Sequence, residues 1–158
     1  MIIDAKELNI SELKGKGRTL CIDYGDKRVG IAITDITWMI ASPLTALESN
    51  GIYQKLIRII EDYKVKVIIV GLPKALNGGA SGKQLDKVKR FVTKLDVLCK
   101  GAYIILWDER QSTNGAIRIL DKADISRSQY KTKIDKIAAS FILEGFLDYC
   151  RLNATMNN

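Results

Sequence analysis

Two apolar segments joined by a short polar turn, within Arg18–Asp35, most constrain the fold of this chain. Thr19–Tyr24 and Arg28–Thr34 read as two strands, and Gly25 lies in the turn between them. Asp23 lies where the first strand is expected to end. A carboxylate that emerges from an apolar strand is costly unless a cation, a group of hydrogen-bond donors or a metal ion pairs with it. Asp23 is therefore the first candidate for a functional site.

The rest of the hydrophobic pattern predicts an α/β fold. Val65–Val70, apolar and β-branched except for Lys66, and the apolar run Ala102–Trp107 are typical of strands covered on both faces. Apolar residues recur at helical spacing in Ile52–Tyr63, Gln84–Leu98 and Ile134–Tyr149. We also expect a strand at Trp38–Ala41, a glycine-rich loop at Gly71–Gly82, a helix from Ser112 or Thr113 to Leu120, and a polar loop at Asp121–Lys131. This order predicts a five-stranded mixed sheet, an antiparallel meander plus parallel strands, with helices on both faces.

The length of 158 residues fits a single domain. We expect residues 1–17 to be an N-terminal leader that is mobile or forms a short helix, residues 18–150 to be the domain, and residues 151–158 to be a tail. No apolar run approaches the roughly 20 residues of a membrane span, and the first residues lack a signal-peptide core. A cytoplasmic protein without membrane association is therefore expected.

The net charge of +7 indicates a polyanionic partner, with nucleic acid as the first choice. Histidine is absent, which excludes serine–histidine and cysteine–histidine catalysis and disfavours a zinc site. Cys21, Cys99 and Cys150 lie far apart in the sequence, as expected of buried thiols in a reducing compartment. Metal chemistry in this chain would rest on oxygen ligands, which favour Mg²⁺ or Mn²⁺.

Three further acidic positions could accompany Asp23. Asp108 and Glu109 end the last predicted strand, and because side chains alternate across a strand, only one of them should face a site there. Asp135 lies beside the apolar stripe of the final helix. It is either a site residue or an acid favoured by the helix macrodipole, and the helix alone does not decide between the two.

Carboxylates that converge without a cation repel one another, and divalent ions relieve this repulsion. Two such ions roughly 4 Å apart are able to activate a water and stabilise the leaving oxygen in phosphodiester cleavage. The loop Gly71–Gly82 follows a buried strand and precedes a helix, so its backbone amides and Lys74 could meet a phosphate. An ordinary flexible connection explains the loop equally well.

Four motifs in order resemble the YqgF/RuvX family, within the RNase H-like and RuvC-like nuclease fold. They are Asp23–Ala32, Val70–Pro73, Asp108–Thr113 with Ala116, and Lys133–Ala139, and together they span almost the whole domain. The resemblance implies a metal-dependent nuclease that acts on structured nucleic acid. The family is described both as nucleases that mature the 5′ end of pre-16S ribosomal RNA, now the usual assignment, and as Holliday junction resolvases.

The resemblance implies roles for individual residues. Asp23, Glu109 and Asp135 correspond to the catalytic, metal-binding acids, and Asp108 is the less favoured neighbour of Glu109. The cations expected to contact phosphates near the site are Lys27, Arg28, Lys74 and Arg110. Asn77 stands where the family often has aspartate, and Gln111 replaces a commonly apolar residue, which leaves the details of the substrate loop open.

Alternatives to this function also remain. An actin-like or sugar-kinase-like phosphotransferase shares the strand followed by an Asp-x-Gly turn, but that fold needs two such domains and this chain has room for one. A non-catalytic nucleic-acid-binding factor in transcription or ribosome assembly would explain the charge without cleavage. The sequence chooses neither RNA over DNA nor a monomer over a homodimer.

Overall fold

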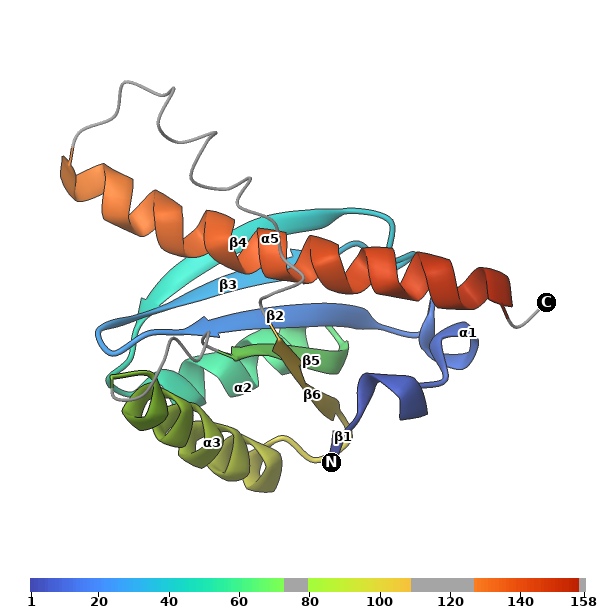
Figure 1. Cartoon of the computed structure of the whole chain (residues 1–158), viewed down its shortest axis with the longest axis horizontal. Helices are drawn as coiled ribbons and strands as arrows, with labels where there is room; N and C mark the ends of the chain where they lie inside the picture. The colour runs from blue at the N-terminus through green and yellow to red at the C-terminus, as the bar shows by residue number, and fades with distance from the viewer. Residues whose placement is uncertain (73–79, 109–126, 157–158) are drawn as a thin grey trace.

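A computed structural model describes the backbone of residues 1–72, 80–108 and 127–156, and the side chains of these except 80–81, 127–136 and 154–156. In this part of the chain, six strands form one mixed sheet in the order β1-β6-β5-β2-β3-β4 (Figure 1). The strands are β1 (Ile2–Ile3), β2 (Arg18–Tyr24), β3 (Arg28–Thr34), β4 (Ala41–Glu48), β5 (Val65–Leu72) and β6 (Tyr103–Asp108). The helices are η1 (Ala5–Glu7), α1 (Ile10–Leu13), α2 (Ile52–Asp62), α3 (Ala80–Leu98) and α5 (Arg127–Met156).

The predicted α/β class and mixed sheet are confirmed. β2, β3 and β4 form an antiparallel meander, while β2, β5, β6 and β1 pair in parallel. The sheet has six strands rather than five, because residues 1–17 contribute β1, which pairs with β6 through Ile2 and Ile3. Leu8 of the same segment is buried against the side chains beneath α5.

The strand expected at Trp38–Ala41 is wrong, because a turn occupies these positions and β4 begins only at Ala41. The Asp35 carboxylate accepts hydrogen bonds from the backbone N–H groups of Met39 and Ile40, both at 2.8 Å, and of Thr37 at 3.0 Å. Within this turn Trp38 takes a left-handed backbone with φ 55°. Its indole is 3% exposed and donates to the Gly17 carbonyl at 2.8 Å.

The last helix starts earlier than expected. Positions 127–131, predicted as the end of a polar loop, already belong to α5. Other expected elements lie outside the described residues, namely the helix from Ser112 or Thr113 to Leu120 and most of the loop Gly71–Gly82. No helix in the described part of the chain combines the length and apolar character that a membrane span requires.

The sheet is covered on both faces, as Figure 1 shows, with α2 and α3 on one side and α5 on the other. Side chains alternate along each strand, so each strand contributes to two separate cores. On the α2/α3 face, buried residues include Leu20, Ile22, Ile31, Ile68, Val70, Ile104, Leu56, Phe91 and Leu95. On the α5 face, they include Cys21, Ala32, Val67, Ile69, Ile105, Trp107, Ala139, Leu143, Phe146 and Leu147.

Candidate active site

Asp23 lies near the carboxyl end of β2, and its side chain is half-buried. Leu20 and Ile22 of this strand pack in the α2/α3 core, and Cys21 packs in the α5 core. Because strand side chains alternate, Asp23 shares the face of Cys21 and is directed to the α5 side of the sheet. This is the face that α5 crosses.

Glycine occupies the strand positions beside Asp23. Gly30 of β3 is its direct partner in the antiparallel pairing. On the other side Ile22 pairs with Val70, so the same register brings Gly71 of β5 next to Asp23. Neither neighbouring strand therefore places a side chain over this carboxylate. Glycine at both positions suits the close approach of an oxygen-coordinated cation or a phosphate.

Asp108 ends β6 on the opposite face from Asp23. Ile105 and Trp107 of β6 pack in the α5 core, while Leu106 packs against the α2/α3 core. Alternation then assigns Asp108 to the α2/α3 side. The structure does not bring Asp108 and Asp23 to one face. Glu109 lies outside the described residues, so its predicted role stays a prediction.

Asp135 lies in α5, four residues before the buried Ala139. The sheet-facing stripe of α5 continues through Leu143 and Phe146. Phe146 contacts Trp38, close to where β2 begins, so the earlier part of α5 extends toward the end of β2 where Asp23 lies (Figure 1). The side chain of Asp135 is not among those described. The described residues contain no group of three or more acidic or thiol side chains able to hold a metal ion.

The turn after Asp23 carries two of the expected phosphate-binding cations, Lys27 and Arg28, and both are exposed. Gly25 donates its N–H to the Arg28 carbonyl at 3.0 Å, and a Cβ at position 25 would lie 2.6 Å from that same oxygen. The turn therefore requires glycine at this position. Ser49 braces the turn further by donating its hydroxyl to the Gly25 carbonyl at 2.8 Å. Lys74 and Arg110 lie outside the described residues.

Gln84 of α3 makes a contact beside Asp23 that the sequence did not predict. Its side-chain amide donates to the Tyr24 carbonyl at 3.0 Å, directly after Asp23. The Tyr24 ring stacks on Phe91 with the centroids 4.3 Å apart. These two contacts fix the end of β2 against α3. The helical spacing of positions 84 and 91 predicted a shared face but could not show which strand end that face would meet.

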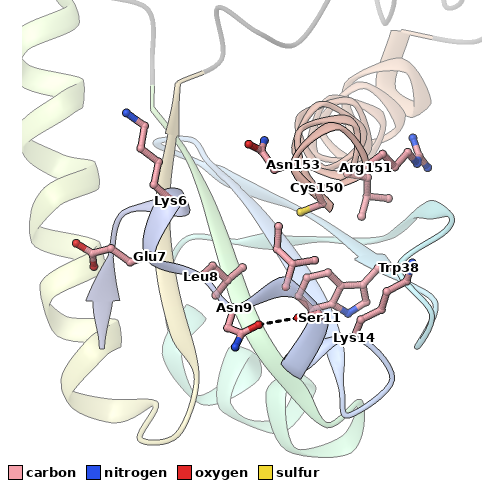
Figure 2. Close-up of a pocket in the computed structure, with 12 residues that line it drawn as sticks. Lys6, Glu7, Leu8, Asn9, Ser11, Lys14, Trp38, Cys150, Arg151 and Asn153 are labelled. Atoms are coloured by element: carbon pink, nitrogen blue, oxygen red, sulfur yellow. Dashed lines mark hydrogen bonds between the residues drawn. The ribbon is translucent and has the colours of Figure 1, made fainter. Parts of the chain in front are cut away.

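A cavity of about 610 Å³ lies at the other end of the sheet (Figure 2). Leu8, Trp38, Leu147 and Cys150 give it apolar walls, and polar side chains such as Asn9 also line it. It adjoins the segment that precedes β2, whereas Asp23 lies five residues into that strand, about 17 Å away at 3.3 Å per residue. The cavity is therefore separate from the candidate site.

The sequence matches a family model described as "RuvX: Holliday junction resolvase" over residues 17–149. A protein of Thermoanaerobacter pseudethanolicus named "Putative pre-16S rRNA nuclease" is 46% identical over 138 residues, which cover 83% of this chain and 96% of the relative. A Staphylococcus epidermidis protein of the same name is 41% identical over 145 residues, which cover 84% and 96% of the two chains.

Solved structures share the fold at low sequence identity. "T. thermophilus RuvC in complex with Holliday junction substrate" aligns with a TM-score of 0.55 and 13% identity, and the alignment covers 86% of this chain and 96% of that one. "Thermus thermophilus RuvC structure" aligns over the same shares with a TM-score of 0.50. At this identity the likeness concerns the fold, and it confirms the expected RuvC-like, RNase H-like architecture.

Proposed function

This chain belongs to the RuvX family, and from that premise we propose that it is a nuclease that hydrolyses phosphodiester bonds and processes the 5′ end of pre-16S ribosomal RNA in the cytoplasm. The observation that carries the proposal is Asp23, a half-buried carboxylate flanked by glycine at the end of a central strand. Two relatives that are 46% and 41% identical to this chain over the aligned residues carry the name "Putative pre-16S rRNA nuclease".

The proposed catalytic acids are Asp23, Glu109 and Asp135, and they would hold Mg²⁺ or Mn²⁺. Carboxylate oxygens are the ligands that these hard cations prefer, and a chain without histidine offers no competing nitrogen site. The glycine beside Asp23 fits such an ion, because no side chain on the neighbouring strand fills that space. When bound, the cation supplies positive charge for the scissile phosphate and a more acidic water.

The chain's own residues would position the substrate. Asp23 is held by a central strand, and Gln84 fixes the residue that follows it, so the carboxylate needs little reorganisation on binding. Lys27 and Arg28, exposed on the turn after β2, would contact phosphates next to the scissile bond. Lys74 and Arg110 are proposed to do the same from their own segments. Asp108 is not proposed as a ligand, because it shares the opposite face with Leu106.

The test is a cleavage assay on a pre-16S rRNA leader with Mg²⁺ or Mn²⁺. Asp23→Asn should lower kcat by at least about 100-fold while binding persists, because the substitution removes a charge that acts on the reaction and leaves the basic surface intact. Asp108→Asn is the matched control, with the same change at a strand end on the other face, and should cleave normally. Full metal-dependent cleavage by Asp23→Asn would remove Asp23 from the mechanism.

Glu109→Gln, assayed beside Asp108→Asn, tests the choice between these neighbours. We expect Glu109→Gln to lose cleavage, because alternation along β6 assigns Asp108 to the face away from Asp23. Loss of cleavage in Asp108→Asn with normal cleavage in Glu109→Gln would reverse the assignment. Circular dichroism and thermal unfolding of both variants separate a lost ligand from a lost fold.

Cleavage of four-way DNA junctions is the second candidate activity, and the description of the family model as a Holliday junction resolvase favours it. Symmetric cuts in a junction call for a two-fold dimer, whereas 5′-end processing of one RNA strand does not. The same assay with a four-way junction, together with the oligomeric state from light scattering, distinguishes the two. Binding of both substrates without metal-dependent cleavage would instead support a non-catalytic factor.

A further inference from the structure

Helix α3 carries four exposed cations on one flank. Lys83, Lys87, Arg90 and Lys94 follow one another at intervals of four, three and four residues, the spacing that stacks side chains along one line of a helix. The line extends about 17 Å at a rise of 1.5 Å per residue. We call these four residues the α3 basic stripe.

The stripe begins beside the turn that follows Asp23. The Lys87 ammonium lies 2.6 Å from an Asp26 carboxylate oxygen in that turn. Further along α3, the Lys94 ammonium lies 4.5 Å from the centroid of the Tyr53 ring of α2. These two contacts place the stripe on the flank of α3 that faces the β2–β3 turn and α2. The stripe therefore reaches the carboxyl end of β2 from the α2/α3 side, whereas Asp23 faces the α5 side, so a substrate that contacts both passes around this end of the sheet.

Two members of the stripe have charge available for a partner. Lys83 and Arg90 make no ion pair within the described part of the chain, whereas Asp26 and Tyr53 already engage the other two. Asp86 is the exposed acid that α3 itself places near this flank. A second copy of the chain packed here about a two-fold axis would set cation against cation, which disfavours self-association. A polyanion fits this surface better.

We propose that the α3 basic stripe binds the sugar–phosphate backbone of the nucleic acid whose scissile bond lies at Asp23. The inference rests on the proposed nuclease function and specifies how its substrate is held. One strand of a duplex presents a phosphate about every 3.4 Å along the helix axis, so a line of about 17 Å spans several phosphates. Contacts of this kind position the substrate without reading its sequence.

The test removes the two cations that have no ion pair. Lys83→Gln/Arg90→Gln is compared with Lys55→Gln/Arg58→Gln, which removes the same charge from α2. Lys55 and Arg58 are also exposed without an ion pair in the described residues, and they lie about 140–160° around the α2 axis from Tyr53. The control pair therefore points away from the stripe. Both pairs sit at exposed helix positions, where glutamine is well tolerated.

Binding of a fluorescently labelled pre-16S rRNA leader, and of a four-way DNA junction, is measured in EDTA from about 50 to about 200 mM salt. The logarithm of affinity falls linearly with the logarithm of salt concentration, and each lost phosphate contact makes this slope shallower by about 0.7 to 0.9. With two contacts removed, the stripe variant should have a slope that is shallower than that of the wild type by about 1.4 to 1.8. Its loss of affinity across this salt range should be about tenfold smaller than that of the wild type. The α2 control should keep the wild-type slope.

In cleavage assays the stripe variant should raise KM and leave kcat unchanged, and Lys83→Arg/Arg90→Lys should restore KM. An unchanged slope and KM in the stripe variant, or an equal fall in the stripe and control variants, would overturn the proposal. Failure of the proposed function looks different. In that case the stripe variant still shows the smaller salt slope than the wild type, but the wild type cleaves neither substrate. A wild type that binds neither substrate would overturn both proposals.

Discussion

The turn organised by Asp35 should make a measurable, pH-dependent contribution to stability. Burial raises the pKa of the Asp35 carboxyl, but hydrogen bonds from the Thr37 hydroxyl and from the N–H groups of Ile40, Met39 and Thr37 outweigh it and lower the pKa from 3.8 to about 2. A shift of that size corresponds to about 2.4 kcal/mol of differential stabilisation. Solvent access to the turn reduces this, and we expect Asp35→Asn to cost about 1–1.5 kcal/mol at pH 7.

The sign of the pH dependence follows from the lowered pKa. The ionised carboxylate stabilises the fold fully above its unfolded pKa near 3.8, and the contribution disappears as the pH falls through about 2. The difference in unfolding free energy between wild type and Asp35→Asn should therefore be constant between about pH 7 and pH 5 and shrink at about pH 3. Urea unfolding at these three pH values measures it.

Asp62→Asn, an exposed acid at the end of α2, is the matched control and should change stability little at any pH. At pH 7 the Asp35 variant should melt roughly 2–6 °C below the wild type. A cost for Asp35→Asn that is the same at every pH would show that the turn does not depend on the charge. A cost within error of zero would refute the assignment of these hydrogen bonds as stabilising.

The remaining predictions concern the α5 core and the candidate site. Phe146 is fully buried, with its ring centroid 5.4 Å from that of Trp107. Phe146→Ala should therefore lower the free energy of unfolding in urea by about 3–5 kcal/mol, whereas Leu152→Ala, at a residue that is 65% exposed, should change it little. A loss below about 1 kcal/mol in Phe146→Ala would contradict this packing. Cys150 is 5% exposed at the wall of the cavity, and burial raises the pKa of its thiol to about 12. Because the reactive thiolate is then scarce at about pH 8, a disulfide reagent should label Cys150 much more slowly in the folded protein than in the unfolded one. Equal labelling rates at Cys150, located by mass spectrometry, would contradict this. The Asp23→Asn and Asp108→Asn pair described above tests the site itself.

Much of the fold was predictable because continuous apolar runs and helical spacing report burial directly. The β-branched apolar residues of Val65–Val70 predict a strand, and this segment forms most of β5. The error at Trp38–Ala41 has a local cause. An apolar segment read as a strand is drawn into a turn by the Asp35 carboxylate, and Trp38 is buried through a left-handed backbone rather than through strand pairing. Such a side-chain-to-backbone contact leaves no periodic signal.

The sixth strand was unpredictable for a different reason. β1 has two residues, too few to show alternation, and it exists because β6 offers an unpaired edge to Ile2 and Ile3. The early start of α5 likewise depends on the rest of the helix, since its first residues are polar and lack an apolar stripe. Tertiary context decides both elements, and a reading of local sequence cannot include it.

The candidate site was predictable only in part. The pattern of apolar residues placed Asp23 near the end of a strand, and the structure adds which face it takes and that Gly30 lies beside it. For Asp108, alternation along β6 assigns the opposite face. The contact from Gln84 to Tyr24 joins residues 60 positions apart, so no local pattern could have indicated it. The joint role of Asp23, Glu109 and Asp135 stays a prediction.

The pairing of β1 with β6 has a consequence for synthesis on the ribosome. Ile2 and Ile3 leave the ribosome before their partners Ile104 and Ile105, which are about 100 residues further along the chain. At roughly 5–20 residues per second, these partners follow about 5–20 seconds later. In the last part of that interval, once β5 has itself emerged, this strand, which is apolar along nearly its whole length, has no neighbour on its β6 side. The nascent chain thus carries an open, aggregation-prone edge until β6 emerges, and this stage is where we expect the protein to depend most on chaperones.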